Sequence, residues 1–227
     1  MLSIVGTPIG NLSDLSYRQA RAILTADIIL AENTGSAGIL LQQIPEMFPD
    51  LLDEKNPNLR VVGFHKDNEF EKLSEALGFI QADKNVVLIS ESGMPIISDP
   101  GSSLIKQVIK AELPFEVVPG PTAWTTALVY SGFNPVGSVF LGFLPKKPQD
   151  KEKLMKSFTS DTVYVAYESP YRVIETLEVL DNVQPNTEVV ICRELTKKFE
   201  EIIRGKAADL LHRDYKGELT IVLRTAK

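Results

Sequence analysis

The sequence predicts an α/β protein of two domains, with a parallel sheet in the N-terminal domain and a mixed sheet in the C-terminal domain. Two observations support this fold class. In the N-terminal part, short runs rich in Val and Ile alternate with segments of helical period, which is the pattern of βαβ units. In the C-terminal part, the last strand-like runs follow one another with little helix between them, which indicates antiparallel pairs.

Five strands are expected in the N-terminal part, because each is a short apolar run bounded by turn residues. They are Leu2–Gly6, Asp27–Ala31, Arg60–Phe64, Asn85–Ser90 and Phe115–Val118. Apolar residues at helical spacing predict helices between them, most clearly over Phe70–Ile80 and Pro100–Ala111.

Five further strands are expected in the C-terminal part on the same grounds. They are Ser138–Phe143, Thr162–Tyr167, Thr187–Cys192, Glu200–Arg204 and Glu218–Leu223. Helices are expected near Lys151–Phe158 and over Tyr171–Leu180. The polar, proline-punctuated stretch Leu144–Asp150 is typical of a linker. The domains are therefore expected to span residues 1–143 and 144–227.

The composition excludes several kinds of site. The single cysteine, Cys192, cannot form an internal disulfide, and its apolar neighbours favour a core position over a nucleophile. With two histidines and one cysteine the usual zinc site cannot be assembled, so no metal is expected. No apolar run is long enough to span a bilayer and the N-terminus has no basic signal region. A cytoplasmic protein without membrane contact is therefore expected.

The net charge of −6 bears on the partner. Because an acidic protein repels phosphate over most of its surface, a general nucleic-acid-coating function is disfavoured. An enzyme with one basic cleft is compatible with this charge.

Three glycine-containing loops follow strands of the N-terminal domain. They are Val5–Leu12, Ser90–Gly101 and Val118–Ala123. Open α/β sheets bind ligands at the carboxyl ends of their strands, so the three loops together predict a binding crevice. None has the spacing of a phosphate-binding loop, and the first loop alone is equally compatible with a plain turn.

Individual residues in these loops have different interpretations. Pro100 is suited to begin a helix, with Asp99 as its N-cap. Glu91 has no such structural role and is the better functional candidate. Thr122 is suited to cap a helix that begins near Ala123.

Charged residues also follow two strands of the C-terminal domain. They lie in Tyr167–Arg172 and Arg193–Lys198. A single Glu or Lys is usually a solvated surface residue. Two acidic and basic clusters at equivalent strand ends favour the lining of a cleft.

Nine short blocks occur in a fixed order over nearly the whole chain. They are Gly6–Leu12, Ala31–Thr34, Phe64–Glu69, Ser90–Gly101, Pro119–Ala123, Gly142–Pro145, Tyr167–Arg172, Arg193–Lys197 and Lys216–Leu219. Together they resemble the ribosomal RNA small subunit methyltransferase I family, within the tetrapyrrole methylase superfamily. The resemblance implies a Rossmann-like N-terminal domain and a homodimer that binds S-adenosylmethionine in an interdomain cleft. It also implies 2′-O-methylation of a cytidine in the decoding region of small-subunit (16S) ribosomal RNA.

The resemblance also implies roles for particular residues. The expected cofactor-binding residues are Ser90, Glu91, Ser92, Gly93, Met94, Pro95, Pro121, Thr122, Ala123, Leu144, Glu194, Leu195 and Thr196. The expected substrate-binding residues are Thr7, Pro8, Gly10, Asn11 and His65. A ribose hydroxyl is a poor nucleophile, so a proton acceptor would help its methylation. Glu168 is the candidate for that role, with Arg172 and Lys197 positioning phosphate.

Two motifs depart from the family pattern. Asn33-Thr34-Gly35 stands where the family usually has Asp-Thr-Arg, and the loop Ser90–Pro95 has Glu91 where the family usually has Asp. Many members also continue past the Lys216–Leu219 block into a small C-terminal domain, whereas this sequence ends at Lys227. These departures bear on the RNA acceptor more than on the cofactor.

Other functions therefore stay open. The acceptor could be a tetrapyrrole precursor, another RNA or a protein side chain. Tetrapyrrole enzymes tend to carry a Gly-x-Gly-x-Gly first loop, which Thr7-Pro-Ile-Gly10 does not match. Outside catalysis, the alternative is a module that keeps the fold and binds the cofactor or a partner without turnover.

Overall fold

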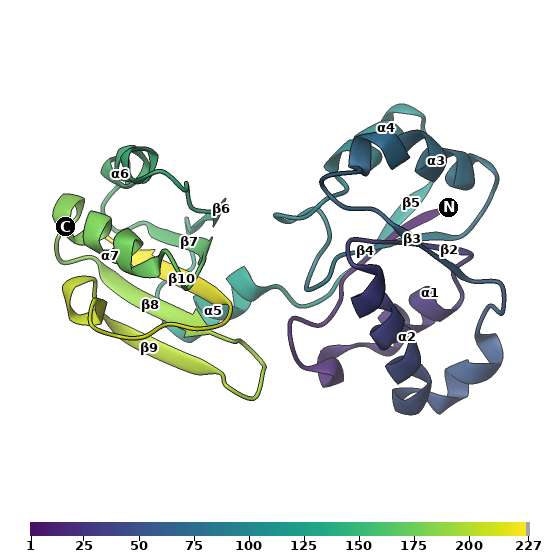
Figure 1. The fold of residues 1–227 in the computed structure, drawn as a ribbon, viewed down its shortest axis with the longest axis horizontal. Coiled ribbons are helices and arrows are strands. Elements are labelled where there is room, and N and C mark those ends of the chain that lie inside the picture. Colours follow the sequence, from purple (N-terminus) through teal and green to yellow (C-terminus); the bar gives the residue numbers. More distant parts are fainter. Residues whose placement is uncertain (226–227) are drawn as a thin grey trace. The chain divides into compact units, whose positions relative to one another are not determined.

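The computed structural model describes residues 1–225 and divides the chain into two compact units, Met1–Pro121 and Thr122–Lys227 (Figure 1). The first unit contains a five-stranded sheet in the order β3-β2-β4-β1-β5, with every neighbouring pair parallel. Its strands are β1 (Leu2–Val5), β2 (Ile28–Ala31), β3 (Arg60–Gly63), β4 (Val86–Ile89) and β5 (Phe115–Val118). The predicted parallel sheet is confirmed.

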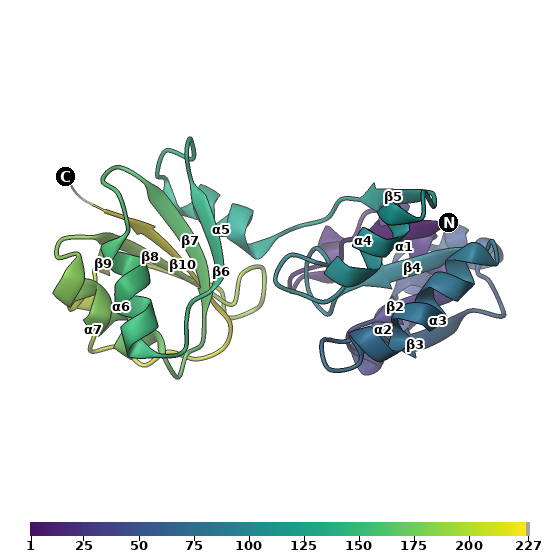
Figure 2. The ribbon, with the colours of Figure 1, turned by 90° about the horizontal axis from the view of Figure 1, so that it is seen from above.

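Helices cover both faces of this sheet, as strands with buried side chains on both sides require (Figures 1 and 2). The helical elements are η1 (Leu12–Asp14), α1 (Tyr17–Leu24), α2 (Thr34–Met47), η2 (Pro49–Glu54), α3 (Glu69–Gln81) and α4 (Ser102–Lys110). Ile23 of α1 and Ile44 of α2 pack with Ile29 on one face. Ile80 of α3 and Leu104 of α4 pack with the other face.

The second unit contains a mixed five-stranded sheet in the order β6-β7-β10-β8-β9. Only β6 and β7 are parallel, and the other pairs are antiparallel, which confirms the predicted mixed sheet. Its strands are β6 (Val139–Phe143), β7 (Val163–Glu168), β8 (Glu188–Arg193), β9 (Glu201–Lys206) and β10 (Leu219–Arg224). Its helical elements are α5 (Ala123–Ser131), α6 (Pro148–Lys156), α7 (Val173–Val183) and η3 (Ala208–Leu210).

The division between the units falls at Pro121, before α5, rather than in the predicted linker Leu144–Asp150. The reason is packing, because α5 lies against β7, β8 and β10, and β6 pairs with β7. The stretch Leu144–Asp150 instead connects β6 to α6, with Lys147 as N-cap and Pro148 in the first helical turn. Residues 226–227, the end of the predicted second domain, lie outside the described residues.

The start of α4 corrects another expectation. The N-cap is Gly101, at φ 119°, and Asp99 does not cap the helix. Glu69, the first residue of α3, serves instead: its Oε1 accepts hydrogen bonds from the backbone nitrogens of Gly101 (3.3 Å) and Ser103 (3.1 Å) and from the Ser103 hydroxyl. A carboxylate satisfies the free N–H groups at a helix start and interacts favourably with its dipole. A residue of one helix therefore anchors the end of the long loop Ser90–Gly101.

We predict that Glu69→Ala lowers the free energy of unfolding by about 1 kcal/mol, because the start of α4 loses its cap. Urea denaturation measures this. Glu71→Ala is the matched control, since Glu71 is an exposed acid in the same first turn of α3. An equal loss in both variants would contradict the capping role.

Candidate functional site

Three predicted loops meet at one edge of the first sheet. Strands β4, β1 and β5 are neighbours and parallel, so their carboxyl ends lie together. The first two loops are joined by a pair of backbone hydrogen bonds. Thr7 donates to the Gly93 carbonyl (2.8 Å), and Gly93 donates to the Thr7 carbonyl (3.2 Å). The crevice predicted from the sequence is therefore built from loops that hold one another.

The first and third loops touch through two glycines. A Cβ added to Gly6 would lie 2.7 Å from both the Cα and the nitrogen of Gly120, closer than real Cβ contacts come. Gln19 of α1 reinforces this contact, because its buried Nε2 donates to the carbonyls of Gly6 (2.9 Å) and Pro119 (3.2 Å). Gln19 was not among the predicted site residues, since nothing in a helical segment marks one glutamine as the tie between two loops.

The loop Ser90–Gly101 is held in an unusual backbone conformation. Gly93 (φ 83°), Ile96 (φ 76°), Ser98 (φ 71°) and Gly101 (φ 119°) all lie in the left-handed region. A β-branched residue such as Ile96 adopts this conformation only when its surroundings impose it, and such strain gathers at functional sites.

The other non-glycine residues with positive φ fall into two groups. Four lie in turns from a helix into a strand, where Asp, Asn and Glu end helices: Asp83, Glu112, Asp161 and Asn186. The remaining two, Glu194 and Thr196, follow β8 in the second predicted cofactor segment. Strain at the carboxyl ends of strands is thus confined, among the described residues, to the loops expected to bind the cofactor.

The long loop itself carries a carboxyl group with a raised pKa. Burial, together with the neighbouring carboxylates of Glu32 and Glu91 and against a hydrogen bond from Ser90, raises the pKa of Asp99 to about 7. At neutral pH this carboxyl group is therefore divided between its charged and neutral forms.

The two sequence departures from the family contact one another. Asn33 caps α2, and its Nδ2 donates to Glu91 Oε1 (3.3 Å). The Ser36 hydroxyl donates to the same oxygen (2.9 Å). Glu91 Oε1 thus accepts hydrogen bonds from a neutral amide and a hydroxyl, whereas a carboxylate at position 33 could not donate to it.

The predicted substrate-binding residues differ in exposure. Thr7 is buried, and its hydroxyl lies near the carbonyls of Ser90 (3.4 Å) and Gly93 (3.3 Å), which favours a role in joining loops. Pro8 is also buried, whereas Gly10 and Asn11 are exposed. His65 follows β3, and its backbone nitrogen donates to Asn68 Oδ1 (2.8 Å).

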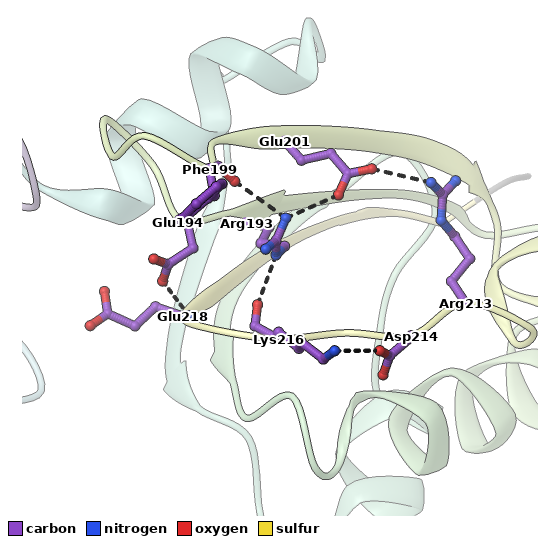
Figure 3. Close-up of polar contacts among 8 residues, drawn as sticks. All are labelled: Arg193, Glu194, Phe199, Glu201, Arg213, Asp214, Lys216 and Glu218. Atoms are coloured by element: carbon purple, nitrogen blue, oxygen red, sulfur yellow. Dashed lines mark hydrogen bonds and ion pairs between the residues drawn. The ribbon is translucent and has the colours of Figure 1, made fainter.

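In the second unit, one arginine joins two loops (Figure 3). Arg193, at the end of β8, donates to the carbonyl of Lys216 (2.9 Å) and to the carbonyl of Phe199 (3.3 Å). It also pairs with Glu201 (3.4 Å). The segment after β8 and the segment before β10 are therefore fixed together.

The predicted residues Glu194 and Lys197 pair with each other within this network. A hydrogen bond from the Glu218 backbone nitrogen (2.8 Å) lowers the pKa of Glu194, and Lys197 lowers it further against burial. Burial lowers the pKa of Lys197, but Glu218 (2.9 Å) and Glu194 (3.3 Å) outweigh it and raise the pKa. Both groups therefore stay ionised. Leu195 is buried, and the Thr196 nitrogen donates to Glu200 (2.6 Å).

Glu168 is buried, and both of its carboxylate oxygens are occupied. Oε1 accepts from the Ser169 nitrogen (2.6 Å) and from Arg172 Nε (2.9 Å), while Oε2 accepts from the Thr176 hydroxyl (2.7 Å). This arrangement holds the turn between β7 and α7. It is better suited to positioning that turn than to accepting a proton from a substrate.

Three other predicted cofactor residues, Thr122, Ala123 and Leu144, lie near α5 and β6. Thr122 is the N-cap of α5 but makes no side-chain capping hydrogen bond, and Ala123 is the first residue of that helix. Leu144 is buried after β6.

Burial raises the pKa of Cys192 to about 12, in keeping with its predicted core position.

Residues 1–225 contain neither a candidate metal site nor a candidate membrane-spanning helix. No cluster of three His, Cys, Asp or Glu side chains within that range could hold a metal ion. No helix within it has the length and apolar character needed to cross a membrane.

Comparisons with known proteins identify the class. A family model described as Tetrapyrrole (Corrin/Porphyrin) Methylases matches residues 1–211. The fold is similar to that of uroporphyrin-III-C-methyltransferase from Thermus thermophilus, with a TM-score of 0.65 and 18% identity over 98% of this chain and 93% of that chain. The chain belongs to the tetrapyrrole methylase family and is therefore a methyltransferase.

Within that family, the similarity in sequence points to one group. The chain is 40% identical over 229 residues to ribosomal RNA small subunit methyltransferase I of a Hydrogenobaculum species, covering 98% of this chain and 94% of the relative. It is 36% identical over 227 residues to the Thermotoga maritima protein of the same name, covering 98% and 97%. The resemblance inferred from the nine sequence blocks is confirmed.

We predict that Gly6→Ala lowers the free energy of unfolding by about 1–3 kcal/mol, because the added methyl group meets the backbone of Gly120. Gly38→Ala is the control. No atom lies within 4 Å of its added Cβ in α2, so this variant gains about 0.5–1 kcal/mol from helix propensity. Chemical denaturation of both variants checks the contrast, and effects of the same sign would contradict the contact.

We predict that Asp99→Asn stabilises the protein increasingly as pH rises. The folded-state pKa of Asp99 is raised from 3.8 to about 7, so its favourable contribution is complete below 3.8 and is lost as pH rises through about 7. Between about pH 4 and about pH 8, the melting temperature of the wild type should therefore fall relative to that of the variant. Parallel curves would show that Asp99 titrates normally.

Proposed function

We propose that this protein transfers the methyl group of S-adenosylmethionine to the 2′-hydroxyl of a cytidine in small-subunit (16S) ribosomal RNA. The observation that carries the proposal is the 36% and 40% identity, over 98% of the chain, to proteins named ribosomal RNA small subunit methyltransferase I. We further propose that it acts in the cytoplasm as a homodimer.

The residues at the edge of the first sheet fit the proposed cofactor. S-adenosylmethionine has no phosphate, which agrees with strand-end loops that lack a phosphate-binding pattern. Its sulfonium is positively charged, and the carboxylates of Glu32 and Glu91, with the partly ionised Asp99, supply a favourable field. When bound, the cofactor supplies an electrophilic methyl group.

The candidate cofactor residues come from several segments. In the first unit they are Ser90–Pro95 and Pro121, and in the second unit they are Thr122, Ala123, Leu144 and Glu194–Thr196. The interlocked backbone of Thr7 and Gly93 supports the first group, because it fixes the loop before any ligand arrives.

The protein's main task in this transfer is to align the acceptor oxygen and exclude water. Glu168 holds Ser169, Arg172 and Thr176, so we propose that it positions the turn between β7 and α7. Lys197 stays positively charged between Glu194 and Glu218, and with Arg172 it remains the candidate for contacting phosphate.

Methyl transfer to isolated small subunits tests the proposal. Subunits from cells that lack the native activity are incubated with the protein and tritiated S-adenosylmethionine, and the labelled nucleotide is mapped. We expect label on one cytidine ribose. Cofactor binding by calorimetry without any label would contradict the proposed acceptor, and no cofactor binding would contradict the proposed chemistry.

The same assay separates the two roles of Glu168. For Glu168→Gln we expect kcat to stay within about tenfold of the wild type while KM for the subunit rises, because the turn is loosened. Loss of a proton acceptor would instead lower kcat by about 10²–10⁴.

A further inference from the structure

The carboxyl ends of three strands share one edge of the second sheet. Strands β6 and β7 are parallel, and β8 runs parallel to them because both β7 and β8 are antiparallel to β10. The end of β6 and the segments after β7 and β8 present three exposed aromatic side chains: Phe143 (60% exposed), Tyr171 (96%) and Phe199 (62%). We call these, with Lys146, Lys147 and Lys198, the aromatic edge.

The aromatic edge is held in a fixed shape. Tyr171 lies in the turn that Glu168 organises, and its backbone nitrogen donates to the Ser169 hydroxyl (3.3 Å). The Phe143 ring packs edge-on against Tyr167, with ring centroids 5.4 Å apart. Large apolar rings that are presented to solvent on a rigid backbone are costly unless a ligand covers them.

The charge of the edge is basic and unpaired. Lys146, Lys147 and Lys198 are exposed, and none of them forms an ion pair with a carboxylate of the described residues. Lys198 Nζ lies over the Phe199 ring at 5.7 Å from its centroid. In an acidic protein these free cations mark where a polyanion is attracted.

We propose that the aromatic edge binds a single-stranded RNA segment, with bases stacked on Tyr171 and Phe143 and phosphates near Lys146 and Lys147. Unpaired bases stack on exposed aromatic rings, whereas bases in an RNA duplex are hidden from them. A purely apolar partner would leave the lysines without compensation. The inference rests on the proposed function, because it states how the RNA acceptor is held.

Fluorescence anisotropy with a labelled single-stranded oligoribonucleotide of about 12 nucleotides tests the edge. We expect Tyr171→Ala to weaken binding by about 5- to 150-fold, the loss of one stacked base, and Tyr171→Phe to bind like the wild type. The double variant Lys146→Ala/Lys147→Ala should reduce the slope of log affinity against log salt by about 1.4. A duplex RNA of the same length should bind more weakly and without dependence on Tyr171.

Matched controls separate this surface from folding and from the cofactor. Lys153→Ala removes an exposed lysine of α6 that likewise has no ion pair among the described residues, and this variant should bind RNA like the wild type. All variants should bind S-adenosylmethionine with unchanged affinity by calorimetry.

Two results would overturn the proposal. One is that the wild type does not bind the single-stranded RNA. The other is unchanged RNA affinity of Tyr171→Ala; if that variant also loses a dimer in sedimentation, the edge is assigned to contact between copies. Tyr171-dependent RNA binding by a protein that fails to methylate small subunits would support the edge and contradict only the proposed acceptor.

Discussion

The mutual backbone pairing of Thr7 and Gly93 is the constraint on which the first unit's site depends. It joins the loop after β1 to the loop after β4, and the contact of Gly6 with Gly120 adds the loop after β5. The parallel order of β4, β1 and β5 brings these loops to one edge, and the glycines let them approach at backbone distance. A rigid site results from segments that are far apart in the chain.

In the second unit, side-chain hydrogen bonds join the segments that follow and precede the strands. Arg193 ties the segment after β8 to the segment before β10, and Glu194 accepts from the backbone of Glu218. Gly217 favours this arrangement, since it lies at φ 77° and an added Cβ would lie 2.5 Å from Glu194 Oε1 and displace that side chain. Arg193 and Glu194, which follow or end a strand, therefore bond to neighbouring segments of the protein. Their polar atoms are engaged in these bonds and are less available to a ligand.

Much of the fold follows from the sequence, because buried strands and helical periods leave a plain pattern. The predictions that were wrong concern residues whose structural partners are distant in the sequence. Asp99 has the spacing of an N-cap, but Glu69 takes that role from another helix. The stretch Leu144–Asp150 has the composition of a linker. However, α5 and β6, which precede it in the chain, already belong to the second unit, because α5 packs against its sheet and β6 pairs with β7.

The sequence predicted which loops form the candidate site, but it did not predict the roles of individual residues equally well. Strand-end glycines mark the loops locally, whereas the occupied carboxylate of Glu168 and the bridging amide of Gln19 depend on tertiary contacts. The contact between Asn33 and Glu91 likewise joins two departures that look unrelated along the chain.

Hydrogen exchange with and without S-adenosylmethionine tests the central claim most directly. If the interlocked strand-end loops bind the cofactor, peptides covering Ser90–Gly101 and Val118–Pro121 should exchange more slowly when it is present, because binding suppresses local opening. Protection that spares both segments while S-adenosylmethionine is bound would contradict the account.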